Sequence, residues 1–219
     1  MADTQIIIFG EVLFDSFPDG SAVLGGAPFN VAWHLQALGT APLFISCVGD
    51  DAQGERIKTA MADWGMDLNG LQTNPDHPTG QVTVNFVDNE PSYDIVNQSA
   101  YDYIQPDRLP DIHGRPLLYH GSLALRNPVS AGTLLTVKRK TAPYVFLDVN
   151  LRSPWWRLKN ILPLLNDTSW LKLNHHELAE LVPNCPNEEK RISQLFSSTS
   201  LKTVTLTRGD KGATTYRLK

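Results

Sequence analysis

The sequence has little cysteine and no long apolar run, and these shortages exclude whole classes of protein. Its 219 residues include two cysteines, Cys47 and Cys185, too few for a disulfide framework. No stretch of about 18 apolar residues occurs, so we predict no membrane span and no membrane partner. The opening Met-Ala-Asp-Thr-Gln lacks the basic and apolar regions of a secretory signal. We therefore predict a cytoplasmic protein.

Positive charge is also scarce. The chain has 19 Lys and Arg against 23 Asp and Glu, a net charge of −4, whereas nucleic-acid binding requires a basic surface. The basic cluster Lys138–Lys140 follows an apolar helical pattern and predicts the solvated end of a helix. We expect no nucleic-acid partner. The hydrophobic fraction of 42% is too high for a disordered chain and suffices for a sizeable core.

Strand and helix signals alternate along the chain. The apolar run Ile6–Phe9 ends at Gly10 and predicts a buried strand. A helix is predicted from Pro28, with apolar residues at helical spacing until Gly39. Further strands are predicted at 42–48, 117–119, 144–148, 170–173 and 204–206, and further helices around 57–64, 158–165 and 192–196. This order indicates an α/β fold, a mostly parallel sheet flanked by helices.

The pattern changes between residues 80 and 98. Apolar residues alternate with polar ones in 81–87 and 92–96, around a turn signal at Asp88–Pro91. This predicts an inserted antiparallel hairpin, a small β lid beside the main sheet; the alternative is an edge hairpin without a role. We expect this hairpin to be exposed with an apolar face, Val82, Val84 and Phe86, which suggests the further hypothesis of a homodimer in which two lids pair.

Polar residues gather where predicted strands end. These residues are Asp15, Asp148, Asn150, Asn174 and Thr207. Because ligands of open α/β sheets bind outside the carboxyl ends of the strands, we expect a crevice there.

The segment Gly25-Gly26-Ala27-Pro28-Phe29-Asn30 holds the strongest local signal. Two glycines before a helix allow a ligand to approach the backbone and its amides, and Asn30 offers a donor and an acceptor to hydroxyl groups. The alternative is a tight turn that only packs the helix. Neither a G-x-G-x-x-G dinucleotide fingerprint nor a P-loop is present.

Several motifs, in order, resemble those of the ribokinase/PfkB carbohydrate kinase family. Gly25–Ala32 followed by Gly49–Gly54 is similar to its N-terminal signature, and Gly10–Asp15 and Asp148–Trp155 resemble the fructokinase branch. Asn174–Glu177 resembles the N-x-x-E motif of the family, and Thr207–Gly212 its T-x-G-x-x-G turn. The resemblance implies a ribokinase-like fold with a β lid, and ATP-dependent phosphorylation of a sugar with Mg²⁺.

The same resemblance assigns roles on the sugar side. It implies that Asp15 hydrogen-bonds sugar hydroxyls, with Gly25, Gly26 and Asn30 completing the pocket, and a carboxylate can accept two hydroxyl hydrogens at once. Arg152 would reach the sugar or its phosphorylated end. The alternatives are a turn residue for Asp15 and a surface ion pair for Arg152.

On the nucleotide side, the resemblance implies that Asn174 and Glu177 serve the phosphates and the metal, with Glu177 facing Mg²⁺. The alternative for this pair is a helix cap with an acid in the first turn. Thr207, Gly209 and Gly212 would line the ATP phosphates; the alternative is an ordinary β-turn.

One motif of the family is missing. Its G-A-G-D motif, which the resemblance ties to the anion hole and the catalytic base, does not occur in the 219 residues. We therefore name no catalytic residue, and interpret residues 1–219 as one α/β sugar-kinase domain lacking its C-terminal part, able to bind sugar without turnover. Fructose, giving fructose 6-phosphate, is the favoured acceptor. The alternatives are a 2-keto-3-deoxygluconate or nucleoside kinase of the same fold, or a non-catalytic sugar-binding relic.

Overall fold

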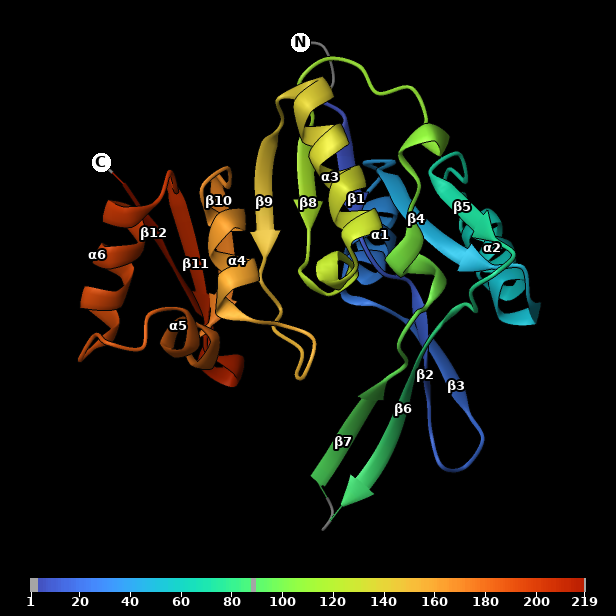
Figure 1. The fold of residues 1–219 in the computed structure, drawn as a ribbon, viewed down its shortest axis with the longest axis horizontal. Coiled ribbons are helices and arrows are strands. Elements are labelled where there is room, and N and C mark those ends of the chain that lie inside the picture. Colours follow the sequence, from blue (N-terminus) through green and yellow to red (C-terminus); the bar gives the residue numbers. More distant parts are fainter. Residues whose placement is uncertain (1–3, 88–89, 219) are drawn as a thin grey trace.

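The computed structural model describes residues 4–87 and 90–218, which build an eight-stranded sheet with helices on both faces (Figure 1). The strand order is β12-β11-β10-β9-β8-β1-β4-β5, and every pairing is parallel except that of β11 with β12. The strands are β1 (Ile6–Phe9), β4 (Leu43–Gly49), β5 (Leu71–Asn74), β8 (Leu117–His120), β9 (Tyr144–Asp148), β10 (Trp170–Asn174), β11 (Thr203–Thr207) and β12 (Ala213–Arg217). The predicted mostly parallel α/β sheet is confirmed.

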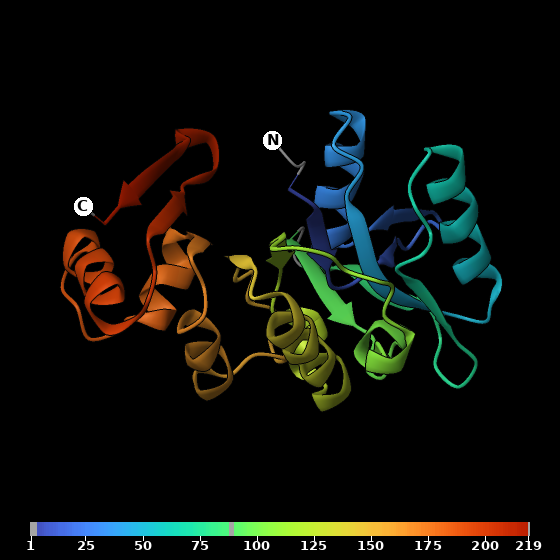
Figure 2. The ribbon, with the colours of Figure 1, turned by 90° about the horizontal axis from the view of Figure 1, so that it is seen from above.

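The helices divide between the two faces of the sheet, as the view from above shows (Figure 2). Helices α1 (Ala27–Ala37) and α2 (Ala52–Asp63) pack on the face that carries Ile8 and Phe44. The opposite face carries Ile7 and Leu147 and is covered by α3 (Pro128–Thr141), α4 (Leu158–Leu165), α5 (His175–Leu181) and α6 (Glu188–Ser198). Short 3₁₀ turns lie at η1 (Ala100–Tyr103), η2 (Pro106–Arg108), η3 (Leu123–Arg126) and η4 (Gly209–Lys211). No helix of the described chain is long and apolar enough to cross a membrane.

A second, four-stranded sheet extends from the edge of the first. Its strands are β2 (Leu13–Ser16), β3 (Ala22–Gly25), β6 (Gly80–Val87) and β7 (Glu90–Ile95), in the order β3-β2-β6-β7. The outer pairings are antiparallel and the central pairing of β2 with β6 is parallel. The predicted hairpin is therefore present as β6 and β7, although the turn residues 88–89 lie outside the described residues. Strands β2 and β3 were not predicted.

The apolar face of this hairpin is not exposed as we expected. Val82 is 5% exposed and Val84 is 3% exposed, and Val82 packs in a cluster with Leu13, Ile95 and Tyr101. The expectation is wrong for both valines, and for Val82 the reason is that β2, β7 and the chain after β7 supply an intramolecular partner. The side chain of Phe86 lies outside the described residues, and the homodimer remains a prediction.

The basic cluster Lys138–Lys140 forms the last turn of α3, as predicted. Its first member is not solvated, however. The Lys138 side chain is 8% exposed, and its Nζ lies 3.2 Å from a carboxylate oxygen of Asp167. A helix-end position alone therefore did not establish exposure.

The parallel strands end at one edge of the main sheet, and the small sheet hangs from that same edge (Figure 1). The segments after β1, β8 and β9 consequently meet the small sheet there. This edge is the place where ligands of open α/β sheets bind.

Candidate functional site

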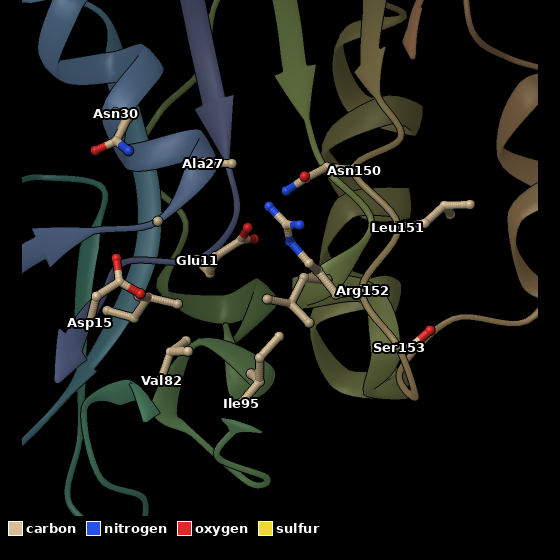
Figure 3. Close-up of a pocket in the computed structure, with 13 residues that line it drawn as sticks. Glu11, Asp15, Ala27, Asn30, Val82, Ile95, Asn150, Leu151, Arg152 and Ser153 are labelled. Atoms are coloured by element: carbon tan, nitrogen blue, oxygen red, sulfur yellow. The ribbon is translucent and has the colours of Figure 1, made fainter. Parts of the chain in front are cut away.

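A cavity of about 470 Å³ lies at this edge, between the two sheets (Figure 3). Segments far apart in the sequence line it. They contribute Glu11, Leu13 and Asp15 after β1, Gly26, Ala27 and Asn30 at the start of α1, Val82 and Ile95 from the small sheet, and Asn150–Ser153 after β9, together with Leu123. The cavity thus combines apolar side chains with a few polar groups, a composition typical of small-molecule sites.

Four of the five residues predicted on the sugar side line this cavity: Asp15, Gly26, Asn30 and Arg152. Gly25 lies beside it, since a Cβ built on Gly25 would stand 3.0 Å from Oδ2 of Asp15. The structure therefore brings the five together, while their binding roles remain predictions. One expectation is wrong: Asp15 lies within β2 of the small sheet rather than at the end of a main-sheet strand.

Gly26 fixes how helix α1 meets the cavity. Its φ of 110° lies outside the range of L side chains, and a Cβ there would stand 2.7 Å from the backbone oxygen of Glu11. Gly26 is the N-cap residue, Pro28 occupies the first helical turn, and the Asn30 amide donates to the Gly26 oxygen at 2.8 Å. The positive end of the helix dipole is thereby directed to the cavity wall.

Asp15 faces Arg152 across the cavity (Figure 3). Partial burial raises the pKa of the Asp15 carboxyl, and the positive charge of Arg152 offsets this less strongly. A half-buried carboxylate with a cation opposite is suited to accept hydrogen bonds from a neutral polyol.

Glu11 is the residue of this site that the sequence analysis missed. It follows the Gly10 turn and is 1% exposed, yet its side chain lines the cavity. The signal for it was available, because Glu11 is the single charged residue between Ile6 and Phe14. An acid inside an apolar stretch is rarely buried without a partner or a function.

Asp148, also predicted at this edge, does not line the cavity. Its Oδ2 accepts hydrogen bonds from the Tyr119 hydroxyl at 3.1 Å and from Nζ of Lys172 at 2.7 Å. Two residues later Asn150, with a φ of 40°, turns the chain into the cavity wall. Asp148 therefore anchors the strand end from which Arg152 projects.

Asn174 and Glu177 form a reciprocal cap at the start of α5. The Asn174 side chain accepts from the Glu177 amide at 2.9 Å, and the Glu177 carboxylate accepts from the Asn174 amide at 2.8 Å. The other oxygen of Glu177 accepts from the Leu151 amide at 2.9 Å. The capping alternative is thus present, and Glu177 also ties α5 to the loop that carries Arg152.

A metal role for Glu177 remains a prediction. Among the described residues no group of three or more His, Cys, Asp or Glu side chains could hold a metal ion. Mg²⁺ could be held near Glu177 only as it usually is with nucleotides, by phosphate oxygens, waters and one or two carboxylates. Each Glu177 oxygen keeps a lone pair for a metal-bound water.

The predicted nucleotide turn follows β11 at the same edge, where Thr207 pairs with Asn174. Gly209 and Gly212 have φ values of 59° and 81°, and nothing lies within 4 Å of a Cβ built on either. Backbone conformation therefore favours glycine here, and the open space would admit phosphate groups. These residues do not line the sugar-side cavity, and their role remains a prediction.

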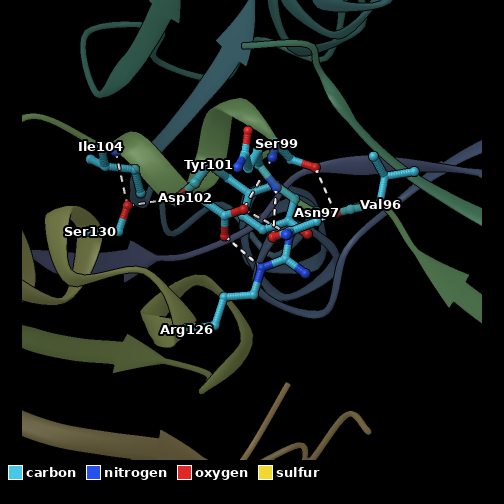
Figure 4. A network of polar contacts seen from close by, with 9 residues as sticks. Val96, Asn97, Ser99, Tyr101, Asp102, Ile104, Arg126 and Ser130 are labelled. Atoms are coloured by element: carbon cyan, nitrogen blue, oxygen red, sulfur yellow. Dashed lines mark hydrogen bonds and ion pairs between the residues drawn. The ribbon is translucent and has the colours of Figure 1, made fainter. Parts of the chain in front are cut away.

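A buried polar network supports the small sheet where it joins the main body (Figure 4). Arg126 donates to both carboxylate oxygens of Asp102 at 2.7 Å and to the Val96 oxygen at 2.7 Å. The Arg126 side chain is 5% exposed and that of Asp102 is 1% exposed. The network fixes the chain that leaves β7 and hence one wall of the cavity.

Comparison with known proteins decides the family. The family model described as pfkB family carbohydrate kinase matches residues 10–219. The chain belongs to the pfkB family. Its resemblance to the ribokinase/PfkB kinases is thereby confirmed, and fructokinases among the relatives support the fructokinase-like branch.

Two curated relatives illustrate this kinship. A fructokinase of Klebsiella pneumoniae is 31% identical over an alignment covering 80% of this chain and 62% of that protein. An aminoimidazole riboside kinase of Salmonella typhimurium is 32% identical, covering 75% of this chain and 54% of that protein. This pfkB chain therefore spans about 62% and 54% of the length of these relatives.

The fold agrees with a solved pfkB structure. The apo structure of fructokinase from Vibrio cholerae O395 superposes with a TM-score of 0.86 at 25% identity, covering 98% of this chain and 78% of that one. The ribokinase-like fold expected from the motifs is confirmed.

Proposed function

We propose that this chain serves ATP-dependent phosphorylation of a sugar hydroxyl, with fructose as the favoured acceptor and fructose 6-phosphate as the product. The observation that carries the proposal is the cavity that unites Asp15, Gly26, Asn30 and Arg152 at the carboxyl edge of a pfkB-family sheet. The fructokinase names of relatives favour a ketose as the acceptor.

In this proposal the chain positions the acceptor. Asp15 accepts hydrogen bonds from two sugar hydroxyls, Asn30 exchanges hydrogen bonds with a third, and Arg152 closes the cavity from the opposite wall. In the kinase reaction the reacting hydroxyl oxygen would form a bond to the γ-phosphorus of ATP, and the bond from that phosphorus to the ADP oxygen would break. The hydroxyl proton would pass to the base that the resemblance places in the G-A-G-D motif, which the 219 residues lack. Mg²⁺, bound with the nucleotide, would neutralise phosphate charge.

The nucleotide would lie along the same edge, against Thr207, Gly209 and Gly212, with Glu177 toward the metal. We expect binding without turnover from the 219 residues, because the G-A-G-D motif is absent from them. Cytoplasmic location, a homodimer and the single-domain interpretation of residues 1–219 belong to the proposal too.

A riboside kinase is the second candidate, favoured by the 32% identical aminoimidazole riboside kinase. An acidic acceptor such as 2-keto-3-deoxygluconate is less well matched, because the cavity places two carboxyl groups, Glu11 and Asp15, against the one guanidinium of Arg152.

Calorimetry on the purified chain tests the proposal. Fructose, a riboside and 2-keto-3-deoxygluconate are titrated separately, then Mg·ATP, with ADP formation monitored. We expect fructose to bind, with affinity at least tenfold weaker in Asp15→Asn; Arg152→Ala should weaken an acidic acceptor far more than a neutral one. Binding of none of the three would overturn the sugar-binding assignment. Sugar binding without nucleotide affinity would fit either the non-catalytic relic or a truncated kinase.

A further inference from the structure

Glu11 is a buried acid, and no contact in the described part of the fold explains its burial. It follows β1, is 1% exposed, and lines the cavity between Asp15 and the start of α1 (Figure 3). Among the described residues its Oε2 has no hydrogen-bond partner. Buried acceptors of native proteins are nearly always paired, so an unpaired one that faces a cavity indicates a ligand or a bound water.

The groups around Glu11 oppose one another. Arg152 on the facing wall and Arg126 behind the cavity favour its ionised form, whereas Asp148 disfavours it. The charge of Glu11 also raises the pKa of the Tyr101 and Tyr119 phenols, and the Tyr101 hydroxyl has no partner in the described structure. Burial is the largest influence and raises the pKa of Glu11 to about 7.

We propose that Glu11 is a further substrate-binding residue, whose Oε2 accepts a hydrogen bond from a sugar hydroxyl in the cavity. This inference rests on the proposed sugar-binding function and narrows its substrate class. Two carboxylates in one cavity select a neutral polyol with hydroxyl donors to both, and they disfavour acidic sugars.

A hydroxyl donor binds an ionised carboxylate more strongly than a neutral carboxyl. Sugar binding should therefore draw Glu11 toward its ionised form and release its proton. The pKa of Glu11 in the sugar-free chain is about 7. Below pH 7 the sugar affinity should therefore rise by up to about tenfold per pH unit, and above pH 7 it should level off.

The experiment measures fructose binding to the 219-residue chain by calorimetry between pH 5.5 and 8.5. At pH 7 the titration is repeated in two buffers with different ionisation enthalpies, which counts the protons released. For the wild-type chain we expect about half a proton released at pH 7. Glu11→Gln should bind about tenfold more weakly above pH 8, without proton release.

Two controls separate Glu11 from its neighbours. Asp15→Asn should bind fructose weakly yet still release the proton near pH 7, and the exposed Glu180→Gln should match the wild type. The proton count on the unmodified chain remains decisive if Glu11→Gln fails to fold. Fructose binding with no proton release, or unchanged in folded Glu11→Gln, overturns this inference alone; no sugar binding at any pH overturns the proposed function with it.

Discussion

Charged side chains are buried at one end of the carboxyl edge of the main sheet and exposed at the other. At the Glu11 end, formed by β1, the start of α1 and the root of the small sheet, Glu11 and Asp102 are each 1% exposed. At the Gly209 end, formed by β10, β11 and the following turn, the ion pair of Arg208 with Glu188 is 26% and 35% exposed.

This difference shows which polar groups lose their water when the chain folds. At the Glu11 end the polar groups are desolvated by folding, before any ligand binds, and a ligand meets acceptors that are already oriented. At the Gly209 end the groups are hydrated and the turn has open space around it. We therefore expect mutations at the Glu11 end to change stability and binding together, and mutations at the Gly209 end to leave stability nearly unchanged.

The largest expected effect comes from the paired arginines. Arg126→Ala leaves the carboxylate of Asp102 buried without its cation and should lower the free energy of unfolding by about 3–5 kcal/mol. Arg208→Ala removes an exposed pair and should leave the urea midpoint almost unchanged. Equal midpoints for the two variants in urea denaturation would remove the contrast between the two ends.

The second effect is the pH dependence of stability. The pKa of Glu11 is about 7 in the folded chain, against an ordinary value of 4.5 for a solvated glutamate, so folding binds a proton more tightly. Stability is then highest below pH 4.5 with respect to this group, and it falls by about 3 kcal/mol as pH rises through 7. Urea titrations from pH 5 to 8 measure the free energy of unfolding, and its fall with pH should be smaller in Glu11→Gln than in the wild type. The same pH dependence in both proteins would contradict the raised pKa of Glu11.

The third effect separates two glycines that differ in backbone conformation and in the room for a Cβ atom. Gly26→Ala must adopt a φ of 110° against the Glu11 backbone and should cost roughly 2 kcal/mol. Gly132→Ala, in the middle of α3 with nothing within 4 Å, should instead stabilise by about 0.5–1 kcal/mol. Thermal unfolding monitored by circular dichroism measures both, and destabilisation by the two alike would refute the backbone argument.

The smallest expected effect on stability comes from the cap of α5, which lies between the two ends. Glu177→Ala removes acceptors for the amides of Asn174 and Leu151 and should cost about 1 kcal/mol. Glu180→Ala on the same helix is exposed and makes a matched control with almost no change. If both variants unfold at the same denaturant concentration, the cap does not contribute.

Most of the main sheet could be predicted because its strands are short apolar runs ended by glycine or a polar residue. Ile6–Phe9 and Tyr144–Asp148 were predicted with the observed bounds. Strands β2, β5 and β12 could not be found that way. Asp15 interrupts β2, β5 reads Leu-Gln-Thr-Asn, and β12 is largely exposed, so none shows the alternation of a half-buried strand.

Site residues followed the same division. Asp15, Gly26, Asn30 and Arg152 belong to recognisable motifs and were predicted to share a pocket, as the structure shows. Glu11 was missed although it stands alone as a charge in an apolar stretch. Arg126 was missed because its burial depends on contacts with distant segments, at Asp102 and Val96. Local sequence patterns carry no information about those contacts.

The parallel pairing of β2 with β6 has a consequence for how the chain acquires its shape. Leu13–Ser16 aligns with Gly80–Thr83, so the two strands can meet only by closing a loop of all the chain between them, which includes α1, β4 and α2. Such a long loop closure is slow and entropically unfavourable. We expect the small sheet to assemble late in refolding, and a peptide of residues 80–98 alone to remain unstructured in water.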